Sequence, residues 1–248
     1  MENKTTHFGF ETVNTAEKTK KVAEVFNSVA KNYDLMNDLM SLGIHRAWKK
    51  IAVMMSGAKS GNKVLDLASG TADLAMKFCK VVGSNGVVVV SDINNEMLQI
   101  GRDRLIDQGF SNNAKFSLAD AQDLPFPNDT FDVVSIAFGL RNVTDKDKAL
   151  KSMARVLKPG GKLMILEFSK PKAKLVKELY DHYSFKVIPL LGQIFAKDSS
   201  SYKYLAESIR MHPTQDELKL MMEDAGFVDN SFLNMTSGIV AIHTGIKP

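Results

Sequence analysis

The sequence predicts an α/β fold in which helices pack around a central, mostly parallel sheet. From residue 63 onward, short apolar runs rich in valine and isoleucine alternate with longer amphipathic segments, as strands and helices do in a parallel sheet. The first run ends in a tight turn at Gly70, and the second is a valine run that ends at Asp92. A strand, a glycine turn, a helix and a second strand ending in a carboxylate are the layout that binds nucleoside-bearing cofactors.

Individual elements follow from the spacing of apolar residues. Five strands are expected in the parallel part of the sheet, at residues 63–68, 86–91, 114–119, 131–137 and 162–168. The helices between them are expected at 71–82, 94–108 and 144–157, and Lys158-Pro-Gly-Gly161 indicates a sharp end to the last of these. Two closing strands, 227–235 and 238–246, would form an antiparallel pair and complete a seven-stranded sheet. Thr214 and Glu217 have the spacing of a helix capping box.

Helical segments precede this alternating region. Residues 1–15 are polar and are expected to form a flexible N-terminus. Apolar residues at three- and four-residue spacing predict an amphipathic helix over 16–32, and another helix is expected at 45–55. Between them, 33–43 is interpreted as a short helix or a helical loop. This helical preface, residues 16–60, could pack beside the cofactor as a lid.

The remaining segments add no second domain. A helical insertion over residues 171–212 interrupts the alternation of strands and helices. The chain has no internal repeat and no low-complexity tract. Residues 16–248 are therefore expected to fold as a single domain.

Composition narrows the class of protein. The chain has 248 residues, of which 44% are hydrophobic and 24% charged, which is ordinary for a globular protein. No apolar run approaches the roughly 20 residues that span a bilayer, and no signal peptide is visible. The one cysteine, Cys79, is interpreted as a buried structural thiol, which suits the cytoplasm. The histidines lack metal-ligand spacing, so no metal is expected.

The glycine turn also indicates which cofactor to exclude. A dinucleotide-binding turn would have glycine at 68, 70 and 73, whereas this chain has Ala68, Gly70 and Asp73. Asp73 would place a negative charge in the first helical turn, where a pyrophosphate would otherwise bind. A nicotinamide oxidoreductase is therefore disfavoured. S-adenosylmethionine fits better, because it has a ribose and positive charges but no phosphate. Asp73 itself is interpreted as a helix N-terminal charge.

Candidate cofactor-binding residues lie at the carboxyl ends of the first two strands, where ligands of such sheets bind. Gly70 is expected to let the backbone approach the cofactor, and Thr71 either caps the next helix or bonds the ligand. Asp66 is a buried carboxylate whose partner is either the cofactor's ammonium or a structural hydrogen-bond network. Asp92 suits the two ribose hydroxyls, with a helix N-cap as the alternative.

The next strand ends carry the rest of the expected site. Asp120 can accept from the adenine amino group while the Ala121 N–H donates to the ring, unless Asp120 is an ordinary loop acid. Arg141 and Asn142 follow the fourth strand and face the reactive end of the cofactor. Arg141 has a pKa above about 12 and cannot act as an ordinary base, but it can stabilise a phenolate or hold a water with Asn142. The alternative role for Arg141 is a surface salt bridge.

Four blocks of the chain resemble one family. Val25–Trp48 resembles the opening motif of the ubiquinone/menaquinone biosynthesis C-methyltransferases. Phe138–Ala149, Arg155–Gly161 and Tyr202–Pro213 are similar to the later blocks of that family. The resemblance runs from about residue 19 to the C-terminus. It implies a class I, Rossmann-like methyltransferase that transfers a methyl group from S-adenosylmethionine to a ring carbon of demethylmenaquinol or 2-methoxy-6-polyprenyl-1,4-benzoquinol.

The resemblance also assigns residues. It places Thr71, Asp92, Asp120 and Ala121 on the family's cofactor positions. Ala137 stands where members often have a serine, so that only a backbone contact is expected there. Ser69 and Ala72 stand where glycine is common.

The opening motif supplies two further candidates. Tyr33 and Asp34 could close over the acceptor ring, with core packing and helix capping as the alternative.

A polyprenyl tail would explain the segment 175–196, which mixes aromatic and aliphatic residues with lysines such as Lys177 and Lys186. The segment would line an apolar groove or lie on the inner face of a membrane. The alternative is a cap helix with solvated lysines. The sequence leaves open whether the chain forms a homodimer. Two rival functions are another S-adenosylmethionine enzyme with a small polar acceptor and a nucleic-acid-binding module. The latter is disfavoured because the lysines are scattered.

Overall fold

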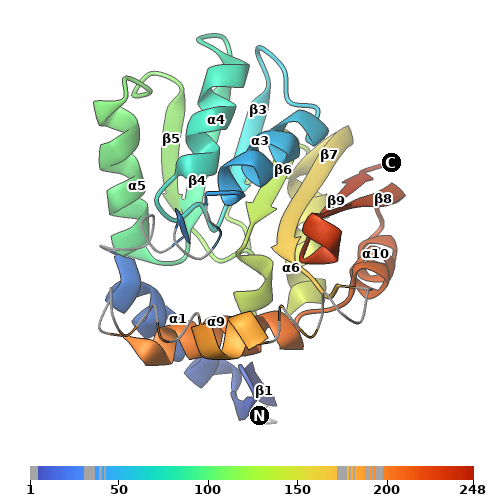
Figure 1. The fold of residues 1–248 in the computed structure, drawn as a ribbon. Coiled ribbons are helices and arrows are strands. Elements are labelled where there is room, and N and C mark those ends of the chain that lie inside the picture. Colours follow the sequence, from blue (N-terminus) through green and yellow to red (C-terminus); the bar gives the residue numbers. More distant parts are fainter. Residues whose placement is uncertain are drawn as a thin grey trace.

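Seven strands form one twisted sheet in the order β5-β4-β3-β6-β7-β9-β8 (Figure 1). Their bounds are β3 Lys63–Leu67, β4 Val87–Asp92, β5 Ala114–Leu118, β6 Phe131–Ala137, β7 Leu157–Phe168, β8 Val228–Met235 and β9 Val240–Ile246. The first five run parallel, and β9 pairs antiparallel with both β7 and β8. The predicted fold class, a mostly parallel seven-stranded sheet with an antiparallel last strand, is confirmed. This computed structural model describes residues 5–30, 37–38, 41, 43–171, 178, 180, 182–187, 190, 193 and 198–248.

Helices cover both faces of the sheet and form two hydrophobic cores. Their bounds are α3 His45–Met55, α4 Asp73–Val82, α5 Asn95–Asp107, α6 Lys146–Val156 and α10 Gln215–Asp224. Helices α3, α4 and α5 pack on one face through residues such as Val53, Phe78 and Leu105. Helices α6 and α10 pack on the other face through residues such as Met153 and Met222. A strand buried on both faces reads as a continuous apolar run, which is why the valine run of β4 was recognisable in the sequence.

A local signal sets the start of α10, whereas the end of α6 differs from the prediction. Thr214 and Glu217 form the predicted capping box at the start of α10. Helix α6 ends at Val156, and the chain enters β7 directly at Leu157, so the strand is longer than the predicted 162–168. The Pro-Gly-Gly stretch therefore lies inside the strand, next to an irregularity in the β6–β7 pairing between Phe131 and Val133. A bulge of this kind accommodates proline and glycine in a strand.

The prediction of a flexible N-terminus is wrong for residues 5–14, which form a β-hairpin. Strands β1 (Thr5–Phe8) and β2 (Glu11–Asn14) pair antiparallel around a turn in which Gly9 has a φ of +58°. The Phe8 ring stacks on Tyr204 at 4.1 Å between ring centroids. Tyr204 belongs to α9 (Ser199–Met211), almost 200 residues later in the chain. A contact this distant in sequence gives no local signal, and it explains the missed element.

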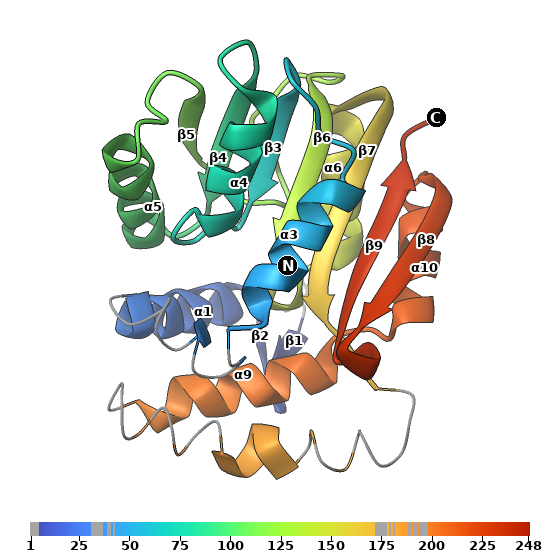
Figure 2. The ribbon, with the colours of Figure 1, turned by 45° about the horizontal axis from the view of Figure 1, so that its top comes forward.

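Two helices outside the alternating region cross the carboxyl ends of the parallel strands. Helix α1 (Thr15–Val29) and helix α9 lie side by side below the sheet in Figures 1 and 2. Helix α1 confirms most of the helix predicted over 16–32. Of the insertion 171–212, the structure describes α9 and a π-helical turn at Tyr183–Val187, and much of 172–197 lies outside the described residues. Among the helices that are described, none is long and apolar enough to cross a bilayer.

Candidate functional site

Two adjoining cavities lie between the carboxyl ends of the strands and the helices α1 and α9. The smaller, of about 150 Å³, is the nucleoside cavity; it is lined by Gly70, Asp92, Asp120 and Ala121 from the strand ends and by Val22, Ala23 and Phe26 from α1. It lies at the point where the strand order reverses between β3 and β6, which is the expected binding position in such sheets. The larger, of about 390 Å³, is the aromatic cavity; its walls include Trp48, Phe138, Phe168, Tyr180, Tyr202 and Tyr204.

Asp92 is positioned by the glycine turn. Its carboxylate accepts hydrogen bonds from the backbone N–H groups of Gly70 at 2.9 Å and of Asn94 at 2.8 Å. Burial raises its pKa, although these hydrogen bonds act in the opposite direction. The N-cap of α5 is Asn94, not Asp92. The helix-cap alternative for Asp92 is therefore wrong. Since each carboxylate oxygen has two acceptor positions, Asp92 retains capacity for the hydroxyls of a ribose.

Asp66 is fully buried on β3 and is held by two hydroxyls. Ser135 Oγ donates to it at 2.6 Å and Ser69 Oγ at 3.0 Å. Burial raises the pKa of Asp66 to about 6, against the effect of these hydrogen bonds. The structural network that the sequence left as one alternative is thus present. The raised pKa of Asp66 means that these hydrogen bonds offset only part of the free-energy cost of burying the charged carboxylate.

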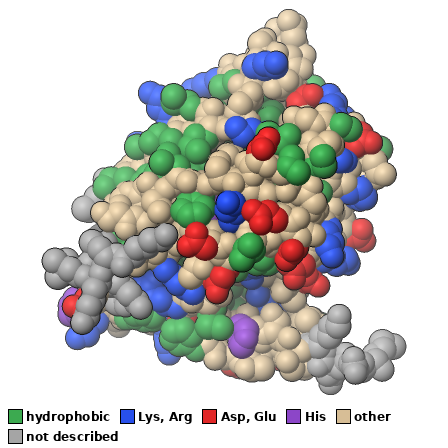
Figure 3. Space-filling view, turned by 90° about the vertical axis from the view of Figure 1, so that its right-hand side faces the viewer, with side chains coloured by type: hydrophobic (Ala, Val, Ile, Leu, Met, Phe, Trp, Pro, Cys, Tyr) green, Lys and Arg blue, Asp and Glu red, His purple; other side chains and the backbone are tan. Residues whose placement is uncertain are grey.

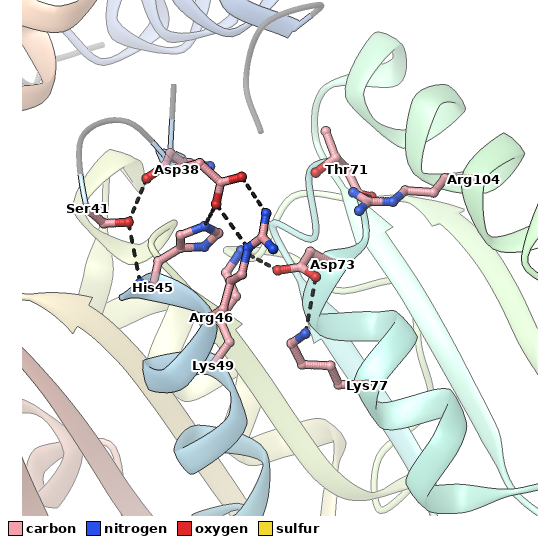
Figure 4. Close-up of polar contacts among 10 residues, drawn as sticks. Asp38, Ser41, His45, Arg46, Lys49, Thr71, Asp73, Lys77 and Arg104 are labelled. Atoms are coloured by element: carbon pink, nitrogen blue, oxygen red, sulfur yellow. Dashed lines mark hydrogen bonds and ion pairs between the residues drawn. The ribbon is translucent and has the colours of Figure 1, made fainter. Parts of the chain in front are cut away.

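The pKa of Asp73 is shifted in the opposite direction to that of Asp66, because two lysines pair with its carboxylate. Lys49 Nζ lies 2.8 Å and Lys77 Nζ 3.3 Å from its carboxylate oxygens (Figure 4). Burial would raise the pKa of Asp73, but the lysines lower it to about 2. The sequence argument that Asp73 repels a pyrophosphate treated its charge as unpaired. The structure corrects this point, since the carboxylate is one member of a cluster of three charges.

The other predicted cofactor residues divide into two groups. Asp120 and Ala121 line the nucleoside cavity, and the Asp120 carboxylate accepts from the backbone and side-chain nitrogens of Gln122. Asp66, Thr71 and Ala137 are not among the described lining residues of either cavity. Thr71 does not cap α4, whose N-cap is Ala72 without a side-chain hydrogen bond.

The backbone of the glycine turn is strained where the sequence departs from glycine. Ala72 has a φ of +62° and Ala68 a φ of +49°. The left-handed region favours glycine, because other residues pay a steric penalty of about 1 kcal/mol or more there. This conformation gives a physical reason for the glycine that the resemblance led us to expect at position 72.

Asn142 connects the two cavities. Together with Phe26 and Phe138, it lines both. The Tyr204 hydroxyl donates to Asn142 Oδ1 at 3.0 Å, so the amide nitrogen is the remaining side-chain donor of Asn142. Asn142 and Arg141 lie on a short 3₁₀ turn, Leu140–Asn142, directly after β6. A fixed amide donor therefore stands at the boundary between the nucleoside and aromatic cavities.

Arg141 lies in the aromatic cavity as half of a buried ion pair. Its Nη1 is 2.8 Å from Glu167 Oε1, and the two side chains are only 6% and 2% exposed. Its guanidinium also lies 5.5 Å from the centroid of the Phe168 ring. The alternative of a surface salt bridge is wrong, because the pair is buried. The guanidinium charge is balanced by Glu167, so Arg141 acts in this site as a fixed donor more than as a net positive charge.

The sequence reasoning missed several residues of this site, and one prediction cannot be placed. Tyr33 and Asp34 lie outside the described residues. Trp48, His45, Tyr204 and Glu167 were not singled out, although all but Glu167 line the aromatic cavity. Glu167 gave the one usable signal, a carboxylate inside the otherwise apolar run of β7. Such a residue is normally paired when buried.

The nucleoside cavity suits an adenosine group. A buried carboxylate for ribose, a second acid with an adjacent N–H for adenine, and glycine backbone at close range line one small cavity. Gly139 contributes to this tight wall, since a Cβ added there would come within 2.4 Å of the Ala68 Cβ. The aromatic cavity beside it suits a flat apolar ring.

Comparisons with known proteins agree with this geometry. The sequence model of the ubiE/COQ5 methyltransferase family matches residues 14–247. The chain is 61% identical to the ubiquinone/menaquinone biosynthesis C-methyltransferase UbiE of Cellvibrio japonicus over 247 residues, covering 100% of this chain and 99% of that protein. It is likewise 61% identical to the protein of that name from Pseudomonas putida, covering 98% of this chain and 95% of the relative.

Solved structures share the fold at low sequence identity. A SAM-dependent methyltransferase from Aquifex aeolicus superimposes with a TM-score of 0.61 at 19% identity, covering 81% of this chain and 89% of the other. A SAM-dependent methyltransferase from Thermotoga maritima, described as a possible histamine N-methyltransferase, gives a TM-score of 0.63 at 17% identity, covering 91% and 99%.

Proposed function

Because this chain belongs to the ubiE/COQ5 methyltransferase family, it is an S-adenosylmethionine-dependent C-methyltransferase, and we propose that its acceptor is the ring of a polyprenylated quinol. The expected acceptors are demethylmenaquinol and 2-methoxy-6-polyprenyl-1,4-benzoquinol. One observation carries the proposal: a cavity whose walls include eight phenylalanine, tyrosine and tryptophan side chains adjoins the nucleoside cavity, and Asn142 lines both. A flat ring in the first and a methyl donor in the second would meet at that residue.

The residues of the nucleoside cavity fit S-adenosylmethionine. Asp92 would accept from the ribose hydroxyls, and Asp120 with the Ala121 N–H would bind the adenine. Gly70 would bring its backbone close to the bound molecule, whose positively charged sulfonium supplies an electrophilic methyl group. Asp66, Thr71 and Ala137 would support this wall, and Asp66 has a carboxylate whose desolvation a nearby ammonium would relieve.

The residues of the aromatic cavity would place and polarise the quinol. Loss of a phenolic proton sends negative charge to the ortho carbon, which makes that carbon the nucleophile. Orientation of two reactants in a fixed geometry is worth about 7–11 kcal/mol of the barrier. The Asn142 amide would donate to the developing phenolate oxygen, and Arg141, held by Glu167, would add a second donor. Tyr33 remains a candidate to close over the ring.

The proposal is tested by its product. Cells that lack this protein should accumulate quinones one ring methyl short, as measured by mass spectrometry, and the purified protein should methylate the corresponding quinol. Arg141→Ala should lower turnover while S-adenosylmethionine still binds. Methylation of soluble phenols or amines, with no activity on quinols, would instead support the alternative of a methyltransferase for another small acceptor.

Membrane contact forms a separate part of the proposal. In the insertion, Tyr180 and Tyr183 line the aromatic cavity, while nearby Phe185 and Leu190 are 37% and 54% exposed. Amphipathic elements with exposed aromatic and basic residues bind membrane interfaces. We expect the protein to float with anionic liposomes, and the double variant Phe185→Ser, Leu190→Ser to float less while retaining activity on a short-chain quinol. Light scattering of the same protein distinguishes a monomer from a homodimer.

The face of the molecule shown in Figure 3 gives no support to nucleic acid binding. On the face shown in Figure 3, lysines and arginines alternate with aspartates and glutamates. The described basic side chains of this face form no continuous stripe along which a phosphate backbone could lie.

A further inference from the structure

A histidine of the aromatic cavity wall is paired with an aspartate, and the chemistry above does not use this pair. His45 opens α3, is 8% exposed and lines the cavity. Its Nε2 lies 2.7 Å from Asp38 Oδ1 (Figure 4). Arg46 holds the same carboxylate, with its Nε 3.0 Å from Oδ1 and its Nη2 on Oδ2. Asp38 is thus fixed by two groups from the first turn of α3.

The second nitrogen of the His45 ring has a different environment. Among the residues that the structure describes, no group lies within hydrogen-bonding distance of Nδ1, which is shielded from solvent. With Nε2–H donated to Asp38, a neutral imidazole has its lone pair on Nδ1. A buried lone pair without a donor is unfavourable, and a ligand in the cavity that His45 lines can supply that donor.

We propose that His45, oriented by Asp38, is the general base that takes the proton from the quinol hydroxyl. The inference rests on the proposed function and assigns the proton acceptor that this function requires. A base held by a carboxylate on its far nitrogen is the arrangement by which enzymes fix the tautomer and favour the protonated ring.

The step balances in atoms and charge. The O–H bond breaks, and its proton moves to Nδ1. The electron pair passes through the ring to the ortho carbon, which forms the new bond to the methyl group as S-adenosylhomocysteine leaves. The methylated carbon then loses its own proton while the oxygen regains one, for which the imidazolium is the donor. One proton is released per turnover, and the ring emerges as the methylated quinol.

The surrounding charges favour His45 over its neighbours as the base. The hydrogen bonds from Arg46 and His45 lower the pKa of Asp38, so the carboxylate is ionised and stabilises an imidazolium. Among the residues that the structure describes, the other titratable side chains that line the cavity are Lys49, Arg141, Tyr180, Tyr183, Tyr202 and Tyr204. Lys49 is paired with Asp73 and Arg141 with Glu167. Burial raises the pKa of Tyr180 and of Tyr204 to about 12, so neither accepts a proton as a phenolate near neutral pH.

The test is His45→Gln, assayed with reduced demethylmenaquinol of short chain length. The glutamine Nε2 can still donate to Asp38, but the side chain cannot accept a proton. We expect kcat at pH 7 to fall by about 10²- to 10⁴-fold, the range for loss of a general base, with the S-adenosylmethionine Kd unchanged. The loss should shrink as the pH approaches about 10, where a phenol ionises without help. His7→Gln, at an exposed histidine, is the control and should keep wild-type kinetics.

Three results would overturn the assignment. They are a His45→Gln kcat within about two-fold of wild type, a loss confined to KM, and a loss of equal size at every pH. The last two would indicate a residue that positions the loop or the ring without taking the proton. Failure of the wild-type protein to methylate any quinol would instead overturn the proposed function, so the two failures are distinguishable.

Discussion

The two acids that flank the glycine turn, Asp66 and Asp73, are expected to affect stability in opposite directions. Asp66→Asn should stabilise the protein at neutral pH. Burial raises the Asp66 pKa from 3.8 to about 6, which at 1.36 kcal/mol for each unit corresponds to about 3 kcal/mol. The sign follows from proton binding: between pH 3.8 and 6 the folded state binds the proton more tightly than the unfolded state. The stability of the wild type therefore falls as the pH rises through this window.

The measurement is urea denaturation of both proteins, without ligand, at pH 5 and pH 7.5. From the same pKa values, the advantage of Asp66→Asn should roughly double between these pH values and level off at about 3 kcal/mol. Asp73→Asn is the matched control. Its pKa of about 2 lies below the unfolded value, so its stabilisation is complete above pH 3.8 and is lost only as the pH falls toward 2. Asp73→Asn should cost about 2 kcal/mol at both pH values.

The result that refutes the reasoning is an Asp66→Asn protein no more stable than wild type at pH 7.5, or one whose advantage does not depend on pH. The same variant separates the two roles that the sequence left open for Asp66. If the carboxylate balances the ammonium of S-adenosylmethionine, the affinity for this ligand should fall even though the fold is more stable. An unchanged Kd would leave Asp66 with its structural network alone.

Three further substitutions test other parts of the site. Glu167→Ala should lower the free energy of unfolding by about 3–5 kcal/mol in denaturant titrations, because it leaves the buried charge of Arg141 without its partner. The control Lys158→Ala breaks the more exposed pair with Asp132 and should cost at most about 1 kcal/mol. Equal losses for the two variants would contradict this expectation. Gly101→Ala should lower the free energy of unfolding by about 1–3 kcal/mol, and with it the melting temperature, because the new Cβ would lie 2.8 Å from the Gly70 carbonyl oxygen. Alanine is normally the better helix former, so a more stable variant would show that the turn can move. Tyr204→Phe should lower kcat about ten-fold or less without a change in S-adenosylmethionine affinity, since it removes one hydrogen bond to Asn142; full activity would show that this bond does not orient the amide.

The sequence predicted the parts of this protein that local chemistry determines. Strand alternation, the capping box at Thr214 and the acid at the end of β4 all depend on residues close together in the chain. The stacking of Phe8 in the 5–14 hairpin on Tyr204 of α9 has no local signal in the sequence, and the His45–Asp38 pair was missed because nothing local shows that α3 borders a cavity. The pKa values of the acids were also beyond the reach of the sequence. Asp66 and Asp73 are both acids next to the same turn, but burial raises the pKa of Asp66 to about 6, whereas Lys49 and Lys77 lower that of Asp73 to about 2.

The wall between the two cavities is held in place by packing within the protein. Phe138 lines both cavities with a φ of +54°, a conformation that is costly for a bulky residue and persists only where packing enforces it. That packing is present, because its ring centroid lies 4.8 Å from that of Phe168 and 6.3 Å from that of Trp48. Arg141 reinforces it, since Nη1 donates to the Phe138 carbonyl while Glu167 holds the guanidinium. Because packing within the protein fixes this wall, we expect the free energy of ligand binding to go into placing the acceptor carbon against the methyl group.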